Sequence, residues 1–192
     1  MSSCQISLEN ELTVKNLNAA FACELNAHAK CLAFAVRAES ERRFEAARLF
    51  RAVGRSEKIR VDNHARVIRQ LGGEPESRVD SAEVKSTEEN LALLLEEETR
   101  KIDSMYPRFI QENRSTNNSA ARSFTWALEA GKGNTHLLTE MIEQMRNDEA
   151  NESTEAQLEL YIRPVCGYVS RSREQERCWN CAHFCKTFEV IE

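Results

Sequence analysis

The feature of this sequence that most restricts its fold is a helical repeat of hydrophobic residues that returns four times. Apolar side chains recur at steps of three and four residues over 7–39, 41–71, 87–109 and 117–145. No stretch between these segments alternates with a period of two, as a half-buried strand would. Six Gly and three Pro are few for the many turns of a β-sandwich or barrel. The sequence therefore predicts an all-α fold.

The breaks between the segments predict how the helices are connected. Residues 72–75, with the sequence GGEP, end the second segment, because Gly suits a helix C-terminus and Pro cannot continue a helix. A polar stretch then leads to a helix-capping signature at Thr87, and the connection is about fifteen residues long. Helix pairs joined by short links, with one long connection between the pairs, predict an antiparallel four-helix bundle with one long crossover.

Charge and hydropathy exclude several classes of partner. The chain has 26 basic and 31 acidic residues, a net charge of −5, and no basic block of the kind that holds nucleic acid. No apolar run reaches the ~18–20 residues of a membrane span, and the N-terminus lacks the features of a secretion signal. We therefore expect a cytoplasmic protein that binds no nucleic acid and has no membrane span.

The C-terminal part has a different composition and suggests a second unit. Residues 1–148 form the predicted bundle, 149–159 a charged linker, and 160–192 a segment rich in Cys and aromatic residues. An odd total of seven Cys disfavours a disulfide framework and favours metal ligation or burial. So short a segment has too little core to fold without a metal or a partner surface. Its four cysteines are Cys166, Cys178, Cys181 and Cys185.

Carboxylates interrupt the apolar rows of three helices. Glu24, Glu57 and Glu98 each lie on the inward row, where an unpaired charge is costly, so each needs a cation or a proton. Carboxylates that face one another in a four-helix bundle are typical of a metal site. In carboxylate-bridged di-iron bundles, two helices supply one Glu each and two supply a Glu-x-x-His pair.

The ligands that would complete such a site are replaced here. Arg60 stands three residues after Glu57, where a His would bind metal, and the pair expected on the fourth helix falls on Gly131 and Asn134. Two cations, Arg60 and Lys101, instead share rows with the three glutamates. The pattern favours an internal salt-bridge cluster.

Several spaced motifs resemble those of the rubrerythrin family, over nearly the whole chain. They are AAFACE at 19–24, ENLALLLEEETRKIDSMYPRF at 89–109, NSAARSFTWALEA at 118–130, and VCGY, RCWNC and FEVI in the tail. The resemblance implies a ferritin-like four-helix bundle and a C-terminal rubredoxin-like module. It also implies non-haem di-iron peroxidase activity in the bundle, a one-iron electron donor in the tail, and a homodimer.

The resemblance assigns the seven di-iron positions, of which three keep the ligand type. They are Glu24, Glu57, Arg60, Glu98, Lys101, Gly131 and Asn134. Neither Arg nor Lys suits a metal, since each brings positive charge to the place of the metal charge. We therefore expect no di-iron centre, and one Glu that either holds a proton or accepts a hydrogen bond from Asn134.

Two histidines near these positions are possible substitute ligands, and a third lies nearby on another face. His28 lies one turn from Glu24, and His64 lies one turn from Arg60, so either could enter a ligand set. An inward His is more often a hydrogen-bonded core residue, and this is the reading we favour for both. His136 lies on another face of its helix and is expected to be solvated.

In the tail, the resemblance implies a tetrahedral thiolate site that lacks one member. The arm Cys178–Cys181 is intact, whereas Arg163 stands where the first arm would begin with Cys. Cys166, Cys178 and Cys181 remain, and Cys185 or His183 could supply a fourth ligand if the turn after Cys181 folds back. The module could hold one Zn or Fe, with Zn more tolerant of the change, or the thiols could be free and buried.

Two functions stay open on these grounds, and enzyme status with them. In one, the chain is a rubrerythrin-like pseudoenzyme, a scaffold or docking subunit with salt bridges in place of metals. In the other, it is a non-haem iron oxidoreductase that reduces peroxide or transfers electrons through a non-standard site. Metal content of the bundle would separate them.

Overall fold

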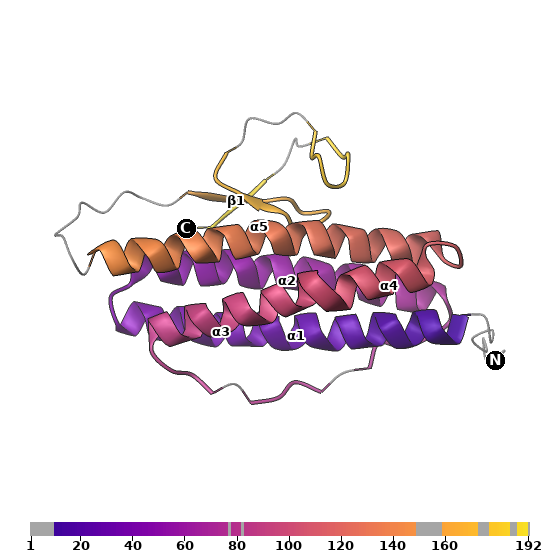
Figure 1. Cartoon of the computed structure of the whole chain (residues 1–192), viewed down its shortest axis with the longest axis horizontal. Helices are drawn as coiled ribbons and strands as arrows, with labels where there is room; N and C mark the ends of the chain where they lie inside the picture. Colours follow the sequence, from indigo (N-terminus) through magenta and orange to yellow (C-terminus); the bar gives the residue numbers. More distant parts are fainter. Residues whose placement is uncertain are drawn as a thin grey trace.

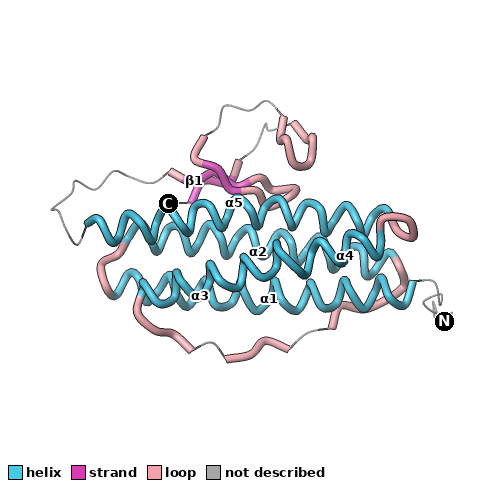
Figure 2. The backbone as a smooth tube through the Cα atoms, viewed as in Figure 1, coloured by secondary structure: helices cyan, strands magenta, loops and turns pink. Residues whose placement is uncertain are grey.

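A computed structural model describes residues 10–76, 78–81, 83–148, 159–172, 177–184 and 188–191. It shows a four-helix bundle with a small strand-containing module on one side (Figures 1 and 2). The helices are α1 (Glu11–Ser40), α2 (Phe44–Gln70), α3 (Thr87–Arg100), α4 (Tyr106–Asn113) and α5 (Asn118–Asp148). The prediction of an antiparallel four-helix bundle is confirmed. None of the helices in the described part combines the length and hydropathy needed to cross a membrane.

The long crossover joins α2 to α3 and is fixed to α1 by two asparagines. Gly72, at φ +80°, ends α2, as the sequence predicts. The connection then runs along the side of the bundle opposite the strands (Figure 1). Asn18 Oδ1 accepts from Glu76 N at 3.0 Å, and Asn26 Oδ1 accepts from Asp80 N at 2.8 Å. These bonds satisfy backbone groups of a segment that has no helix of its own.

One helix start and one capping residue differ slightly from those expected, while α3 begins at Thr87 as predicted. α2 begins at Phe44 because Arg42 adopts φ +60° between α1 and α2, which interrupts the helical path. α3 is capped by Ser86, one residue earlier than the signature placed at Thr87. Ser86 Oγ accepts from Glu89 N at 3.3 Å and the Glu89 carboxylate accepts from Ser86 N at 3.1 Å, which is a capping box.

The third helical segment contains a π-helical turn at Lys101–Met105, between α3 and α4. Pro107 follows at once, and its missing N–H removes one regular helical hydrogen bond. The wider turn moves the inward row by one position, so Tyr106 is fully buried and Met105 is only partly buried. A regular helix would instead have placed Met105, seven residues after Glu98, on the inward row, so this part of the periodic pattern gave a wrong prediction.

Two apolar clusters fill the bundle, one towards each end. One contains Phe34, Phe50, Leu94 and Leu138, and the other contains Leu17, Ile68, Phe109 and Phe124. The buried side chains of Glu24, Arg60, Glu98 and Asn134 fall between residues of the two clusters on their helices. The bundle therefore has a polar layer enclosed by hydrophobic packing at both ends.

The module carries a three-stranded antiparallel sheet in the order β2-β1-β3, with β1 (Leu160–Ile162), β2 (Val169–Ser170) and β3 (Glu189–Ile191). Strands of two or three residues are too short to show alternation, so the sequence did not reveal them. Leu160 and Ile162 join the apolar cluster of Phe50, and the sheet thereby packs on the bundle. Of the predicted linker 149–159, residues 149–158 lie outside the described part.

Candidate functional site

Three helices bring their inward glutamates together at the centre of the bundle. Glu24 comes from α1, Glu57 from α2 and Glu98 from α3, and each side chain has no exposed surface. One carboxylate oxygen from each lies within 4.8 Å of those of the other two. Such spacing is compatible with a shared cation, because unpaired carboxylates this close would repel one another strongly.

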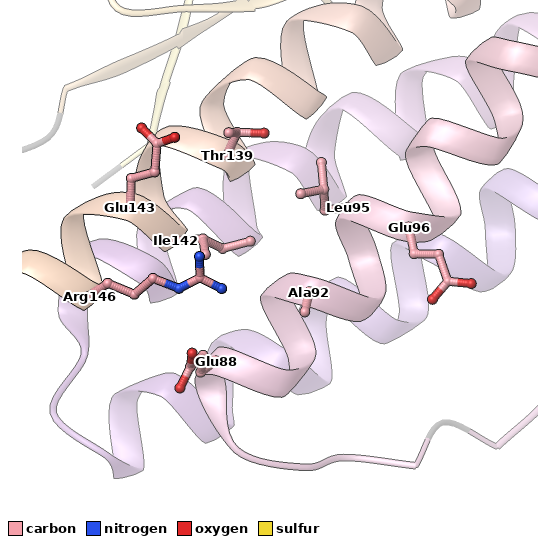
Figure 3. A pocket seen from close by; sticks show the side chains of 8 residues that line it. All are labelled: Glu88, Ala92, Leu95, Glu96, Thr139, Ile142, Glu143 and Arg146. Atoms are coloured by element: carbon pink, nitrogen blue, oxygen red, sulfur yellow. The ribbon is translucent and has the colours of Figure 1, made fainter.

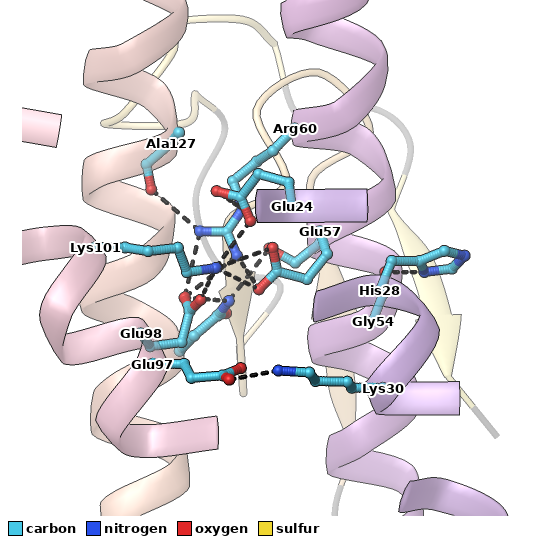
Figure 4. A network of polar contacts seen from close by, with 12 residues as sticks. Glu24, His28, Lys30, Gly54, Glu57, Arg60, Glu97, Glu98, Lys101 and Ala127 are labelled. Carbon is cyan, nitrogen blue, oxygen red and sulfur yellow. Dashed lines mark hydrogen bonds and ion pairs between the residues drawn. The ribbon is translucent and has the colours of Figure 1, made fainter. Parts of the chain in front are cut away.

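Lys101 supplies that cation from the π-helical turn (Figure 4). Its Nζ lies 2.9 Å from Glu24 Oε2 and 3.2 Å from Glu57 Oε1, and it also pairs with Glu98 Oε1. The side chain is 3% exposed, so all three contacts are shielded from water. One ammonium group thus binds a carboxylate from each of three helices.

Arg60 provides the second cation, and its guanidinium group lies on the same carboxylates. Its Nη2 pairs with Glu57 and lies 3.2 Å from Glu98 Oε2, while Nη1 donates to the backbone oxygen of Ala127 at 3.2 Å. Its Nε lies 3.5 Å from Glu24 Oε1. The guanidinium therefore joins α2 to the other three helices of the bundle.

Neutral donors offset the remaining negative charge of the cluster. The Tyr106 hydroxyl donates to Glu24 Oε1, and Asn134 Nδ2 donates to Glu98 Oε2 at 3.4 Å. Three carboxylates face two cations, so one negative charge is stabilised by hydrogen bonds alone. A bond from Asn134 is one of the two alternatives that the sequence left open for this charge. Tyr106 was missed, because the π-helical turn that brings it inward has no periodic signal.

The electrostatics of the cluster favour the charged forms. Burial opposes the ionisation of Glu98, but Arg60 and Lys101 outweigh it and lower the pKa of that carboxyl. Burial also disfavours the Lys101 ammonium, and Glu24 and Glu98 more than compensate, which raises the lysine pKa. The group is therefore an internal ion-pair cluster and not a set of neutral acids.

The histidines His28, His64 and His136 all have partners other than the three glutamates. His28 Nδ1 lies 2.7 Å from the backbone oxygen of Gly54, and His136 is 74% exposed beside Glu140. His64 is fully buried, with Ser123 Oγ 2.9 Å from its Nδ1 and the Tyr106 hydroxyl oxygen 3.4 Å from its Nε2. Burial first, and then Arg60 and Lys101, lower the pKa of His64 to about 3. His64 is thus a neutral hydrogen-bonded core residue.

The tautomer of His64 follows from its partners. Because the Tyr106 hydroxyl hydrogen points to Glu24, the Tyr106 oxygen can only accept, so His64 Nε2 carries the proton. Nδ1 then accepts from Ser123 Oγ. A chain of donors therefore runs from Ser123 through His64 and Tyr106 to Glu24.

A di-iron centre does not fit these side chains. The Lys101 ammonium and the Arg60 guanidinium lie between the carboxylates that would bridge the metals. At Gly131, a Cβ atom would lie 2.8 Å from Ile102 Cγ2, so a longer side chain there needs movement of Ile102. The predicted salt-bridge cluster is confirmed in the place where the family would bind iron.

Three cysteines of the module form a second cluster. The sulfur atoms of Cys166, Cys178 and Cys181 all lie within 4.8 Å of one another, and Cys166 Sγ is 3.6 Å from Cys178 Sγ. A tetrahedral site with Zn–S bonds of about 2.3 Å places its sulfurs about 3.8 Å apart. The three thiols therefore fit three corners of a Zn or Fe site, and a bound ion would cross-link both arms of the module.

The hydrogen bond between Cys166 and Cys178 lowers the pKa of Cys178 to about 5 and raises the pKa of Cys166.

Backbone hydrogen bonds show that Arg163 occupies the fourth corner position. Arg163 N donates to the oxygen of Tyr168 at 2.9 Å, and Cys178 N donates to that of His183 at 3.0 Å. Gly167 N donates to Arg163 O, as Ala182 N donates to Cys178 O. The two turns are equivalent, which pairs Arg163 with Cys178.

The fourth corner receives no thiolate from Arg163. Its guanidinium stacks 4.1 Å above the Phe188 ring, and within the described part of the chain its buried Nε and Nη1 have no hydrogen-bond partner. His183 Nδ1 lies 2.8 Å from the oxygen of Cys181 and is not among the ligand atoms that group with the thiols. Cys185, the other alternative, lies outside the described residues.

Polar side chains of the bundle hold the module in place. Ser56 Oγ donates to the oxygen of Gly167 at 2.6 Å, and Asn63 Nδ2 donates to that of Val165 at 2.8 Å. Gly167 has φ +76°, and a Cβ there would lie 2.9 Å from Ser56 O, so glycine is required at this approach. These contacts were not foreseen, because Ser56 and Asn63 belong to no recognisable motif.

A separate cavity of about 360 Å³ lies between α3 and α5, outside the polar layer (Figure 3). Its base is formed by Ala92, Leu95 and Ile142, and charged side chains including Glu143 and Arg146 surround it. None of the cluster residues lines it. The cavity therefore plays no part in the chemistry of the glutamate cluster.

Comparison with known proteins agrees with this architecture. The rubrerythrin family model matches residues 15–142. The chain is 31% identical over 180 residues to rubrerythrin-2 of Clostridium acetobutylicum, covering 92% of this chain and 95% of that protein. It is 31% identical over 173 residues to nigerythrin of Nitratidesulfovibrio vulgaris, covering 88% and 81%.

Solved structures share this fold, over nearly the whole chain in one case and over most of it in the other. The fully reduced, all-ferrous state of nigerythrin superimposes with a TM-score of 0.79 at 27% identity, covering 99% of this chain and 94% of that one. A bacterioferritin from Desulfovibrio desulfuricans shares the fold, with a TM-score of 0.67 at 18% identity over 78% of this chain and 95% of that one. On sequence and structure together, this chain belongs to the rubrerythrin family.

Proposed function

We propose that this chain is a rubrerythrin-family protein without di-iron chemistry, and that its bundle serves as a scaffold or docking subunit. The position of Lys101 Nζ supports this best, because it pairs with Glu24, Glu57 and Glu98 at once. A protonated amine cannot donate a lone pair to iron, and its charge repels a metal cation. The ligand set therefore favours stability of the bundle over redox catalysis.

The cluster offers a physical reason for keeping three costly carboxylates. Each binds a cation that comes from another helix or from the next helical turn, so the polar layer fixes the register of the helices. Removing one partner of a buried ion pair costs about 3–5 kcal/mol, which makes the set interdependent. A rigid bundle of this kind suits a protein that presents a surface to a second copy of itself or to another protein.

Metal content and assembly state test this proposal together. Full-length protein purified without chelator should contain less than about 0.1 iron atom per chain in the bundle, and should sediment as a homodimer. A ferric absorbance band that disappears in Glu57→Gln would contradict the absence of di-iron chemistry. Sedimentation as a monomer that captures no protein partner would contradict the scaffold role.

The alternative is a non-haem iron oxidoreductase with a non-standard site. One observation favours it: three carboxylate oxygens from three helices still lie within 4.8 Å of one another. Iron would then have to displace the Lys101 ammonium. Peroxide reduction by the iron-loaded chain, lost in Glu98→Gln and kept in Glu97→Gln, would support this alternative.

A further inference from the structure

A cavity of about 490 Å³ lies where the Cys module meets the bundle. It opens between α2, α5 and the turns of the module, and Cys181 of the cysteine cluster forms part of its wall. The lining residues are Asn63, Arg66, Arg122, Trp126, Pro164, Val165, Cys181 and His183. The cavity is therefore a place where a small molecule could contact both a helix surface and a thiol.

Two arginines give this cavity a positive charge. Arg66 Nη2 donates to Asn63 Oδ1 at 3.1 Å, and the Arg122 guanidinium lies 5.5 Å from the centre of the Trp126 ring. Both side chains are exposed, and neither contact neutralises the charge. No carboxylate from the described part of the chain lines the cavity. A ligand that carries carboxylates matches such a pair, since guanidinium groups bind carboxylates through two parallel hydrogen bonds.

The thiol at the wall has a second thiol within reach. Cys181 lines the cavity, and the sulfurs of Cys178 and Cys166 lie within 4.8 Å of it, in a Cys-x-x-Cys turn and its neighbour. Thiols so arranged can exchange with a disulfide and then close one of their own. Arg163 stands where a fourth Cys would be, so these three sulfurs do not make up the four thiolates of a complete tetrahedral metal site.

We propose that this cavity binds a low-molecular-weight disulfide that carries carboxylates, and that Cys181 reacts with it by thiol–disulfide exchange. Cys181 is the cysteine of the cluster that lines the cavity, so it is the one that meets the ligand. It loses its proton to solvent and attacks one sulfur of the ligand, which forms a mixed disulfide and releases one small thiolate. Cys178 then attacks the Cys181 sulfur, which forms a Cys178–Cys181 disulfide and releases the second thiolate. The protein loses two electrons and the ligand gains them, and the two protons from the protein thiols go through solvent to the released thiolates.

This activity is independent of the proposed scaffold role. It uses the metal-free module and the surface of α2 and α5, while the scaffold role depends on the buried glutamate cluster. Either can fail without the other.

The test uses the reduced, chelator-treated full-length protein and two disulfides. One is oxidised glutathione, which carries carboxylates, and the other is bis(2-hydroxyethyl) disulfide, which is neutral. Each rate is divided by the rate of the same disulfide with dithiothreitol, which removes differences in intrinsic reactivity. The glutathione rate should then be about tenfold the neutral one, and should fall as salt increases. Equal normalised rates would overturn the proposal.

Variants assign the roles of individual residues. Arg66→Ala with Arg122→Ala should remove the preference for glutathione, whereas Arg69→Ala, an exposed arginine on the same helix, should keep it. Cys178→Ser should accumulate glutathione on Cys181, located by peptide mapping and mass spectrometry. Glutathione mapped instead to Cys23, or a preference unchanged by the double arginine variant, would overturn the proposal. The arginine variants replace exposed side chains, so they keep the test valid if a cysteine variant fails to fold.

Discussion

Lys101 Nζ lies 2.9 Å from Glu24 Oε2, across 77 positions of sequence and between two different helical segments. Lys101 stands at the start of the π-helical turn, three residues after Glu98, and its side chain is buried in the polar layer. A positive charge therefore stands among the carboxylates of α1, α2 and α3. This relationship decides both the stability and the chemistry that can be expected of the bundle.

Loss of the Lys101 charge should destabilise the fold strongly. Lys101→Met keeps most of the apolar stem but leaves three buried glutamates facing Arg60 alone. The free energy of unfolding at pH 7, measured by urea denaturation, should fall by about 3–5 kcal/mol. Lys132→Met is the matched control, because its ion pair with Glu129 at 2.8 Å lies on an exposed helix face and is worth at most about 1 kcal/mol.

The same variant should respond to acid in a defined way. The pKa of Glu98 is lowered in the native cluster, so its contribution to stability is present above about pH 4.5 and is lost as pH falls. Protonation relieves the repulsion that Lys101→Met creates, so the difference from the natural protein should shrink towards pH 4.5. Equal losses for Lys101→Met and Lys132→Met at pH 7 would show that the cluster is solvated.

His64 should make stability depend on pH between about 6.5 and 3. Its pKa is about 3 in the folded state against about 6.5 in the unfolded chain, so below pH 6.5 only the unfolded state gains its proton. Stability is then complete above pH 6.5 and falls as pH decreases, by roughly 2 kcal/mol at pH 5. His64→Phe should lose this part of the slope. An unchanged slope in that variant would show that His64 is protonated in the folded protein.

Restoring the family's ligands should create a metal site. The substitutions are Arg60→His, Lys101→Glu, Gly131→Glu and Asn134→His, with Ile102→Ala to make room at Gly131, where a Cβ would lie 2.8 Å from the isoleucine. The variant should bind about two ferrous ions per chain, whereas the natural sequence should bind none in the bundle. Iron is measured by colorimetric assay after gel filtration. The same variant without Ile102→Ala should bind less, and failure of both variants would show that backbone geometry has also diverged.

Arg163→Cys should complete a tetrahedral thiolate site in the module. The equivalent turns at Arg163–Tyr168 and Cys178–His183 place residue 163 at the fourth corner, and loss of the arginine removes buried nitrogens that lack partners in the described chain. Reconstituted with ferrous iron in air, the variant should take up one iron and show the red colour of a ferric thiolate site. The natural protein should bind Zn more weakly. A red, reversibly reducible natural protein would restore the electron-transfer function.

Much of the bundle could be predicted from the sequence because its signals are local and periodic. The four helical repeats and the glycines after Leu71 gave the helices and the crossover, and the inward rows gave Glu24, Glu57 and Glu98. Tyr106 was missed because a π-helical turn changes the period for a single turn. Pro107 was the one available signal, since a proline inside a helical pattern removes a hydrogen bond.

The module was less predictable, for a different reason. Its two turns could be recognised by cysteine spacing, but its strands are two or three residues long and depend on contacts with the bundle. Ser56 and Asn63 anchor those turns through backbone oxygens, which leave no pattern in sequence. The cavity beside Cys181 likewise arises only when the module and helices α2 and α5 are brought together.

The most direct test of the account is an anaerobic ferrous titration of the full-length protein beside Glu24→Gln, followed by calorimetry and iron analysis. Glu24→Gln removes one retained carboxylate of the bundle and leaves the cysteine module unchanged. The account predicts the same stoichiometry in both proteins, at most one iron per chain, because Lys101 and Arg60 exclude metal from the bundle. About two additional irons per chain in the natural protein, absent from Glu24→Gln, would contradict it.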